Sequence, residues 1–169
     1  LMNNFLSVCF LCTGNSARSV MARAFFSIKA SEFEATSAGT LVLEGQPMSI
    51  RTRKALASYG LSEPTHLSSQ FGHSHLATDL IVAMEPSHIF WIRRHFPEIA
   101  SRTGTLPRLI RHLPEEGDIE TRIAAMGLAE VEIEDWEEVV DPAGGDQEIF
   151  DRCAEELERL VSQLVAKIS

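Results

Sequence analysis

One run of the sequence, VCFLCTGNSARSVMARAFF at residues 8–26, constrains the fold more than any other part of the chain. The continuous apolar stretch at residues 5–11 is typical of a strand that is buried on both faces. A short polar loop separates this strand from a helical pattern over residues 20–29. A strand, a tight loop and a helix in that order predict a parallel sheet covered by helices, with the loop at the carboxyl end of the first strand.

The loop lies between Cys12 and Arg18 and has the composition of an anion-binding site. Its residues are Thr13, Gly14, Asn15, Ser16 and Ala17, and Ser19 follows the arginine. In a tight loop that leads into a helix, free backbone N–H groups and the helix dipole converge on one space. Arg18 adds two parallel hydrogen-bond donors for an oxyanion, and this positive field favours the thiolate form of Cys12. We therefore expect an oxyanion pocket with a nucleophile at its floor.

Two loop residues have expected structural roles. Asn15 tolerates the left-handed conformation that a tight anion-binding loop requires, and Ser19 is placed to donate a hydrogen bond to the Cys12 sulfur. The competing interpretation is a buried cysteine that ends a core strand, followed by an arginine in solvent. The strand–loop–helix order and the glycine in the loop favour the pocket.

This segment resembles the signature of the low-molecular-weight protein tyrosine phosphatase family, which shares its architecture with thioredoxin-coupled arsenate reductases. Four later segments resemble that family in the same order, and they are TSAGT at 36–40, THLSSQF at 65–71, DLIVAMEPSHI at 79–89 and VVDPAGGDQEIFDRC at 139–153. The similarity extends from about residue 5 to about residue 165 and is weakest between residues 97 and 139. It implies a phosphatase that passes through a cysteinyl-phosphate intermediate.

A thiolate that attacks phosphorus needs a proton donor on the opposite side, because the leaving oxygen departs poorly as an anion. The resemblance implies that Asp141 is this general acid and then the base that activates water. Asp141 lies in a glycine-rich loop before the last helix, and Pro142 stiffens the backbone after it. The competing interpretation is an aspartate that caps the last helix or the turn before it.

The resemblance also gives His66 a supporting role, in which it reaches Asn15 through Ser37 and holds the loop network. The competing interpretation of His66 is a half-buried histidine whose ring nitrogen is satisfied by backbone. His73 and His75 have no third ligand at close spacing and are interpreted as surface residues. We expect no metal and no cofactor, since Arg18 and the loop amides neutralise the phosphate charge.

The rest of the chain alternates apolar runs with helical patterns. It predicts an α/β fold, a three-layer sandwich in which helices flank a central four-stranded parallel sheet, with the phosphate loop after the first strand. Further strands are expected at residues 33–37, 80–83 and 106–113, and further helices at 49–59, 86–96 and 147–168. Residues 1–169 are expected to form one domain, with residues 1–4 a vector-derived remnant or disordered.

Composition excludes several classes of partner. The formal charge of −9 disfavours nucleic acid, and no apolar run is long enough to span a membrane. Three cysteines, one of them in the loop, indicate a reducing compartment and a cytoplasmic location. The expected partners are a phosphorylated protein substrate, and inorganic phosphate or other oxyanions as inhibitors.

The substrate is the least determined feature. Phosphotyrosine is the first hypothesis. Phosphoarginine is the second, because the Asp-Pro-x-Gly-Gly pattern resembles that of bacterial family members that cleave phosphoarginine, although those carry an aromatic residue at the position of Ala143, and because Ser16 is polar. An arsenate reductase is a third, although residues 83–96 contain no cysteine to relay oxidation. A phosphate-binding module without catalysis is the last. Ala17 replaces the second cysteine that many family members carry in the loop, so we expect no protective disulfide there.

Overall fold

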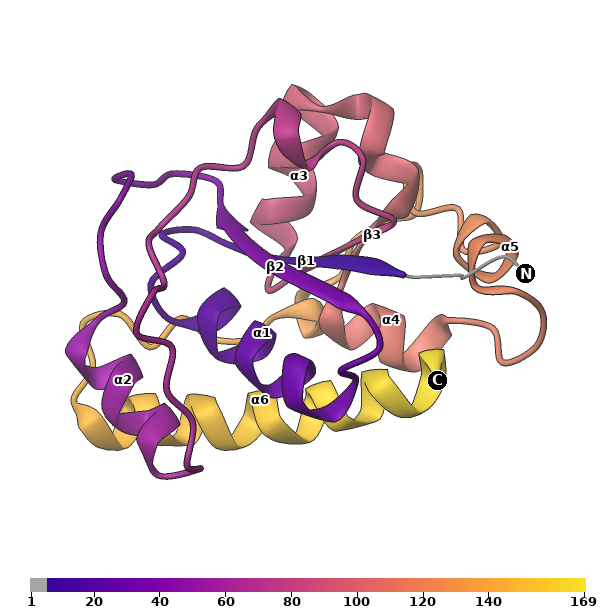
Figure 1. Cartoon of the computed structure of the whole chain (residues 1–169). Helices are drawn as coiled ribbons and strands as arrows, with labels where there is room; N and C mark the ends of the chain where they lie inside the picture. Colours follow the sequence, from indigo (N-terminus) through magenta and orange to yellow (C-terminus); the bar gives the residue numbers. More distant parts are fainter. Residues whose placement is uncertain (1–5) are drawn as a thin grey trace.

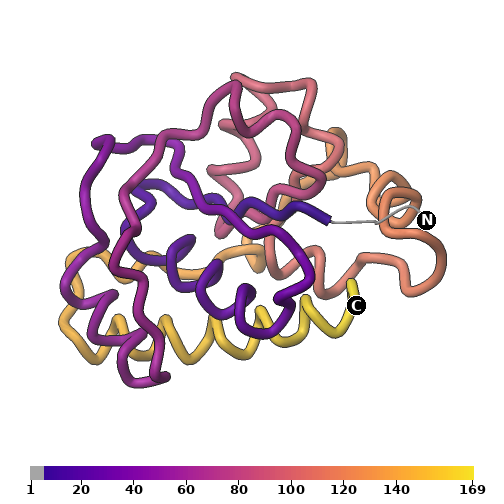
Figure 2. Tube along the Cα trace, viewed as in Figure 1, coloured from indigo at the N-terminus to yellow at the C-terminus, as the bar shows by residue number. Residues whose placement is uncertain are grey.

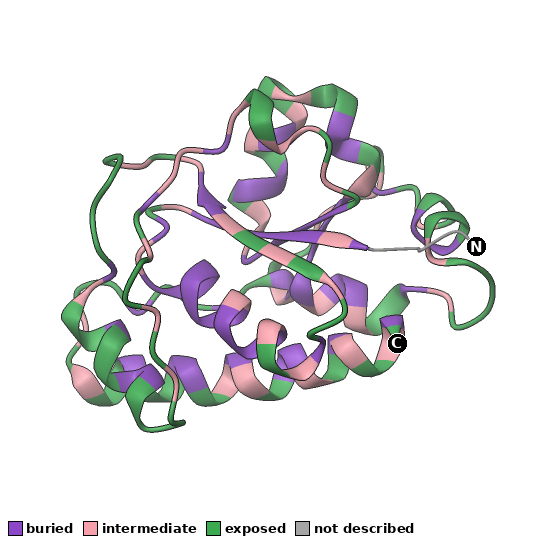
Figure 3. Ribbon diagram, in the orientation of Figure 1, coloured by how far each residue is buried: buried purple, intermediate pink, exposed green. Residues whose placement is uncertain are grey.

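A parallel four-stranded sheet with strand order β2-β1-β3-β4 forms the centre of the computed structural model, which describes residues 6–169 (Figure 1). The strands are β1 (Ser7–Cys12), β2 (Glu34–Gly39), β3 (Leu80–Ala83) and β4 (Thr103–Thr105). β1 and β3 are the central strands and are buried along nearly their whole length, as continuous apolar runs predict (Figure 3). The predicted fold class is confirmed, whereas the expectation for residues 1–4 lies outside the described residues.

Helices cover both faces of the sheet. The helices are α1 (Arg18–Lys29), α2 (Ile50–Ala57), α3 (Pro86–His95), α4 (Leu106–His112), α5 (Ile119–Ala124) and α6 (Gln147–Ile168), and the 3-10 turns are η1 (His73–His75), η2 (Pro97–Arg102) and η3 (Asp135–Glu137). The view in Figure 1 shows α1, α2, α4 and α6 on one side of the sheet and α3 on the other. Alternate residues of β1 therefore enter two different cores, and Cys12 belongs to the larger one, on the α1 and α6 side.

The last helix and the third strand have the predicted bounds, 147–168 and 80–83. The amphipathic spacing of α6 and its N-cap Asp146, whose side chain accepts from the Ile149 N–H, explain why this helix is predictable. Gly60 takes a positive φ of 73° just after α2, as expected for a glycine that ends a helix.

The strand predicted at residues 106–113 is wrong. These residues form helix α4, and the fourth strand is the shorter segment Thr103–Thr105 before it. The Thr105 side chain accepts a hydrogen bond from the Arg108 N–H and so begins the helix. Pro107 falls in the first turn, where an N–H has no helical partner, so it favours the helix and does not interrupt a strand.

The parallel arrangement brings the carboxyl ends of the strands to one edge of the sheet. The segments that follow β1 and β2 meet there, because the Leu41 N–H donates to the Thr13 carbonyl at 3.0 Å. The Cα trace shows the loops after β1 and β2 leaving the same end of the sheet (Figure 2). Ligands of open parallel sheets bind at this edge.

Candidate active site

Cys12 ends β1 and Arg18 begins α1, so the loop between them spans the junction of strand and helix. Cys12 is 3% exposed, and its sulfur lies 2.9 Å from the Ser19 hydroxyl. Ala17 occupies the N-cap position of α1 and provides no side-chain cap, so the first N–H groups of this 12-residue helix receive no capping hydrogen bond from it. This local geometry suits an anion bound in front of the helix and next to the sulfur.

Asn15 is the centre of a hydrogen-bond network that holds the loop. Its φ of 53° makes it the only non-glycine residue with a positive φ in the described part of the chain. Its amide nitrogen donates to the hydroxyls of Ser19 at 2.8 Å and Ser37 at 3.0 Å, and its amide oxygen accepts from the Ser69 N–H at 2.9 Å. The Asn15 carbonyl lies 3.0 Å from Nε2 of His66. Four neutral contacts therefore fix the left-handed residue.

His66 and Ser37 both reach Asn15, but by separate routes. His66 contacts the backbone carbonyl and Ser37 contacts the side-chain amide, so no bond through Ser37 is needed. Partial burial, as the largest effect, lowers the pKa of His66 below its usual range. The neutral ring is therefore favoured. The two interpretations of His66 are both met by one contact, because the backbone group that satisfies its ring nitrogen is the carbonyl of Asn15.

Gly39 lies where no other residue fits. A Cβ atom at this position would lie 2.4 Å from the Thr13 carbonyl oxygen, which is closer than carbon and oxygen approach without a bond. The Thr40 N–H donates to the Cys12 carbonyl at 2.9 Å, so the chain after β2 runs directly along the loop. The glycine in the TSAGT segment thus has a steric reason.

His88 is a buried residue beside the loop that the sequence did not reveal. Its Nε2 lies 3.0 Å from the Thr13 hydroxyl and 3.5 Å from a carboxylate oxygen of Glu85. Burial first, and then the positive charge of Arg18, lower the pKa of His88 to about 4. The ring is consequently neutral at physiological pH and extends the network of neutral groups around the loop.

Arg18 is 2% exposed and is held on one edge of its guanidinium. Its Nη1 donates to the Val139 carbonyl at 2.9 Å and lies 3.3 Å from a carboxylate oxygen of Glu85. Burial opposes ionisation of Glu85, but a hydrogen bond from Ser87 and the charge of Arg18 outweigh it, so the pKa of Glu85 is lowered. With Nη1 engaged, the edge formed by Nε and Nη2 can serve a bidentate oxyanion.

Asp141 lies next to Arg18, with its Oδ2 3.6 Å from the Arg18 Nη2. Its Oδ1 accepts from the Ala143 N–H at 3.0 Å and closes the turn at the buried Pro142. The N-cap of α6 is Asp146 and not Asp141. Of the two structural roles considered for Asp141, it therefore has only the second, which is to cap the turn before the helix. The Asp141 side chain is 47% exposed, so it faces solvent beside the loop and is not buried in an apolar pocket.

The remaining cysteines and the tryptophan of α3 make none of the loop contacts described above. All three cysteines are free and buried, and burial raises the pKa of the Cys153 thiol to about 12. Trp91 is partly buried and packs against the rings of Phe71 and Phe96 beside the smaller core, on the α3 side of the sheet. Within residues 6–169 no group of three potential metal-binding side chains comes together, and no helix there has the length and apolar character needed to cross a bilayer.

Comparison with known proteins gives a consistent result. The model of the low molecular weight phosphotyrosine protein phosphatase family matches residues 7–121, which include the loop and end before Asp141. A protein-arginine-phosphatase from Geobacillus stearothermophilus is 32% identical, and the match covers 95% of each chain. A low molecular weight protein-tyrosine-phosphatase from Streptomyces coelicolor is also 32% identical, over 95% of this chain and 92% of the relative.

Solved structures agree with these relatives. The structure of an arginine phosphatase from Geobacillus stearothermophilus superposes with a TM-score of 0.78 at 29% identity and covers 96% of this chain and 92% of its own. That of a low molecular weight protein tyrosine phosphatase from T. tengcongensis has a TM-score of 0.76 at 30% identity, with 96% and 99% covered. The fold and the loop define a cysteine phosphatase. The chain belongs to the low molecular weight phosphotyrosine protein phosphatase family.

Proposed function

We propose that this chain hydrolyses phosphorylated protein side chains through a cysteinyl-phosphate intermediate, with Cys12 as the nucleophile. The observation that carries the proposal is the position of the Cys12 sulfur, 2.9 Å from the Ser19 hydroxyl and at the amino end of α1, which Arg18 begins. Helix N–H groups and a guanidinium next to a sulfur are the groups that stabilise a thiolate and bind a phosphate dianion.

In the first step, the Cys12 thiolate attacks phosphorus in line and the ester P–O bond breaks. The backbone N–H groups of residues 13–17 and the Nε and Nη2 groups of Arg18 hold the three equatorial oxygens and stabilise the charge that builds there. Asp141 gives its proton to the leaving oxygen, and its place beside Arg18 puts it at the mouth of the same pocket.

In the second step, water attacks the phosphorus of the phosphocysteine and the S–P bond breaks. Asp141, now ionised, takes the proton of this water. The Ser19 hydroxyl donates to the departing sulfur and so favours its release as a thiolate. Inorganic phosphate is the product, and we expect phosphate and similar oxyanions to inhibit by occupying the loop.

Phosphotyrosine is the first substrate that we propose. Leu41 follows the segment that runs along the loop, its N–H is bonded to the Thr13 carbonyl, and it is 79% exposed. An exposed leucine at the edge of the pocket provides an apolar surface against which a phenyl ring can pack. Leu43, two residues further along this segment, is also exposed.

Phosphoarginine is the second candidate, favoured by a different observation. Two carboxylates, Glu85 and Asp141, lie beside Arg18, and the residues after Asp141 are small. Carboxylates can accept the N–H groups of a guanidinium on a substrate, as they do for arginine side chains. Assays of phosphotyrosine and phosphoarginine peptides of matched sequence and concentration decide between the two candidates.

The experiment that tests the proposed function is hydrolysis of p-nitrophenyl phosphate by the parent chain and by Cys12→Ser. We expect turnover by the parent and a fall of at least about a thousandfold in the variant, because a serine hydroxyl is not ionised at neutral pH. Ser162→Ala, a change on the far part of α6, serves as a control and keeps the parent rate. Tight phosphate binding without turnover by the parent would instead indicate a phosphate-binding module.

We also propose a reducing, cytoplasmic location. All three cysteines are free thiols, and a thiolate nucleophile survives best where disulfides are kept reduced. An arsenate reductase is not favoured, because the segment after β3 contains no cysteine and the thiol of Cys153 is buried with a raised pKa.

A further inference from the structure

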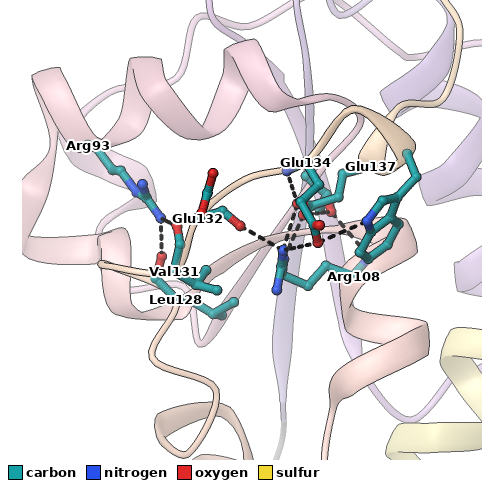
Figure 4. Close-up of polar contacts among 9 residues, drawn as sticks. Arg93, Arg108, Leu128, Val131, Glu132, Glu134 and Glu137 are labelled. Atoms are coloured by element: carbon teal, nitrogen blue, oxygen red, sulfur yellow. Dashed lines mark hydrogen bonds and ion pairs between the residues drawn. The ribbon is translucent and has the colours of Figure 1, made fainter.

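A buried ion pair lies outside the pocket and joins α4 to the segment that precedes Asp141 (Figure 4). The guanidinium of Arg108 donates to both carboxylate oxygens of Glu137, at 2.8 Å from Nε and 2.9 Å from Nη2. Glu137 is 0% exposed and Arg108 is 7% exposed. A bidentate pair without solvent is geometrically demanding, so the two side chains fix each other's position.

The remaining hydrogen-bonding capacity of the pair is also used. Glu137 accepts from the Thr105 hydroxyl at 2.8 Å and from the Glu134 N–H at 2.7 Å, and Arg108 donates to the Glu132 carbonyl at 2.9 Å. Burial opposes the charge on Glu137, but these hydrogen bonds, that of Arg108 first, outweigh it and lower its pKa. Glu137 is therefore an ionised carboxylate in the interior.

Residues 137–141, here called the acid strap, begin at Glu137, the last residue of η3, and continue through the extended Glu138 to Asp141. Glu137 and Val139 are buried, whereas Glu138 and Val140 are exposed, which is the alternation of a strand with one face on the protein. The alternation ends at Asp141, which is exposed like Val140 and whose carboxylate lies 3.6 Å from the Arg18 guanidinium. A shift of one residue in the strap would exchange its two faces and turn the Asp141 carboxylate away.

The middle of the strap connects this register to Arg18. The Val139 N–H donates to the carbonyl of Met84, directly after β3, at 2.7 Å, and the Val139 carbonyl accepts from Arg18 at 2.9 Å. One residue thus docks the strap on the end of the sheet and positions the guanidinium. The Val139 side chain is buried in the larger core, and Glu137, two residues earlier, is the buried charged side chain that fixes the strap from the interior.

Resting on the proposed function, we propose that Arg108 and Glu137 are positioning residues that set the register of the acid strap and thereby place Asp141 and Arg18 for catalysis. Buried ion pairs add little net stability compared with apolar side chains of similar volume, and their best-attested use is to specify one register. An apolar pair would fill the space without selecting which strap residue lies beside β4.

The test replaces the pair by apolar residues in the double variant Arg108→Met with Glu137→Leu. This variant leaves no unpaired charge, and only the Thr105 hydroxyl and the Glu134 N–H lose their acceptor, so we expect the thermal midpoint to fall slightly. The kcat/KM for phenyl phosphate, whose leaving group needs a proton, should fall by about tenfold or more, because a 1 Å displacement of a catalytic group has such effects. The kcat/KM for p-nitrophenyl phosphate, a better leaving group, should fall much less.

A milder variant covers the case in which the double variant does not fold. Arg108→Lys keeps the charge and removes the fork, and we expect a smaller shift in the same ratio of kcat/KM values. Arg122→Lys is the matched control, because Arg122 is equally buried and donates to carbonyls of Pro114 and Lys167 away from the strap. It should lower stability without changing the ratio.

A readout independent of activity is hydrogen exchange of the Val139 amide, which is bonded to Met84. We expect faster exchange in Arg108→Lys and in the double variant, and parental exchange in Arg122→Lys. Parental exchange together with a parental leaving-group ratio in the Arg108 variants would overturn the inference. Absence of turnover by the parent chain would instead refute the proposed function. The exchange measurement would still show whether Arg108 and Glu137 hold the strap in its register.

Discussion

The loop between Cys12 and Arg18, which we propose binds phosphate, and the acid strap meet at Arg18 but are held in different ways. The loop is fixed by neutral groups, namely the side chain of Asn15, serine hydroxyls and two histidines whose neutral form is favoured. The strap is fixed by ions, with Arg108 on Glu137 at one end and Arg18 on Asp141 at the other. A phosphate-binding loop needs donors and no competing negative charge, whereas the strap must carry a carboxylate to the pocket.

Arg18 is the residue that both regions share, so its replacement should have the largest effect. In Arg18→Lys a single ammonium cannot contact the Val139 carbonyl, the carboxylates and two phosphate oxygens together. We expect kcat/KM for p-nitrophenyl phosphate to fall by about a hundredfold to a thousandfold. Arg23→Lys, on the same helix and paired with Glu63, is the control and should keep the parental rate. Near-parental kinetics of Arg18→Lys would mean that phosphate binds elsewhere.

Asp141→Asn separates the strap from the loop. The variant keeps an acceptor for the Ala143 N–H and loses the proton that the leaving oxygen needs. We expect kcat/KM for phenyl phosphate to fall by about a hundredfold, with a much smaller effect on p-nitrophenyl phosphate. Asp146→Asn is a matched control, because asparagine caps α6 as well as aspartate does. Equal losses for both substrates would remove the proton-transfer role of Asp141.

Asn15→Ala tests the neutral network of the loop. It removes the hydrogen bonds to Ser19, Ser37 and Ser69 and places a Cβ in the left-handed region. We expect the free energy of unfolding to fall by about 2 kcal/mol and phosphate to bind about tenfold more weakly. Asn15→Gly relieves the backbone strain but not the lost contacts, so it should regain part of the stability and none of the affinity. Parental phosphate affinity in both variants, measured by calorimetry, would contradict this role.

A pH dependence of stability, which needs no change to the pocket, also tells the two regions apart. His88 has a folded-state pKa of about 4 and an ordinary value of 6.5, so the unfolded chain binds its proton first. Stability is therefore full above pH 6.5 and is lost as the pH falls toward 4, by up to about 3 kcal/mol. The pKa of Glu137 is lowered below 4.5, so the strap loses its stabilisation only at more acidic pH.

Urea unfolding of the parent and of His88→Gln at pH 7 and pH 4.5 measures this difference. We expect the parent to lose more stability than the variant over this interval, because only the parent has the buried imidazole to protonate. Identical losses in the two proteins would show that His88 does not resist protonation in the folded state.

The loop was predictable from the sequence because its geometry is local. Cys12, Asn15 and Ser19 lie within eight consecutive residues, and a strand, a glycine-containing loop and a helix leave few alternative paths for the backbone. The last helix was predictable for a similar reason, since its apolar spacing and its N-cap both lie within one continuous segment of the chain. The left-handed Asn15 follows from the same short-range argument.

The contacts that sequence reasoning missed all depend on the order of strands in the sheet. His88 reaches Thr13 across 75 residues, and Arg108 reaches Glu137 across 29. Neither pair carries a local pattern, because an arginine on a short helix and a glutamate in an acidic run are ordinary surface residues until the sheet buries them. The wrong strand at 106–113 has a different origin, since the Thr105 cap and Pro107 in the first turn are local signals of a helix that the apolar run outweighed.

Trp136 gives the acid strap an optical signal of its own. Its indole ring lies 3.9 Å from the Arg111 guanidinium, and its N–H donates to Glu134, directly beside the strap. Trp91, the other tryptophan of the chain, packs in the opposite layer. Replacing Trp91 by phenylalanine would leave Trp136 as the one tryptophan, whose emission reports on the docking of the strap. Detachment of the strap and unfolding of the whole chain could then be followed separately in one fluorescence titration.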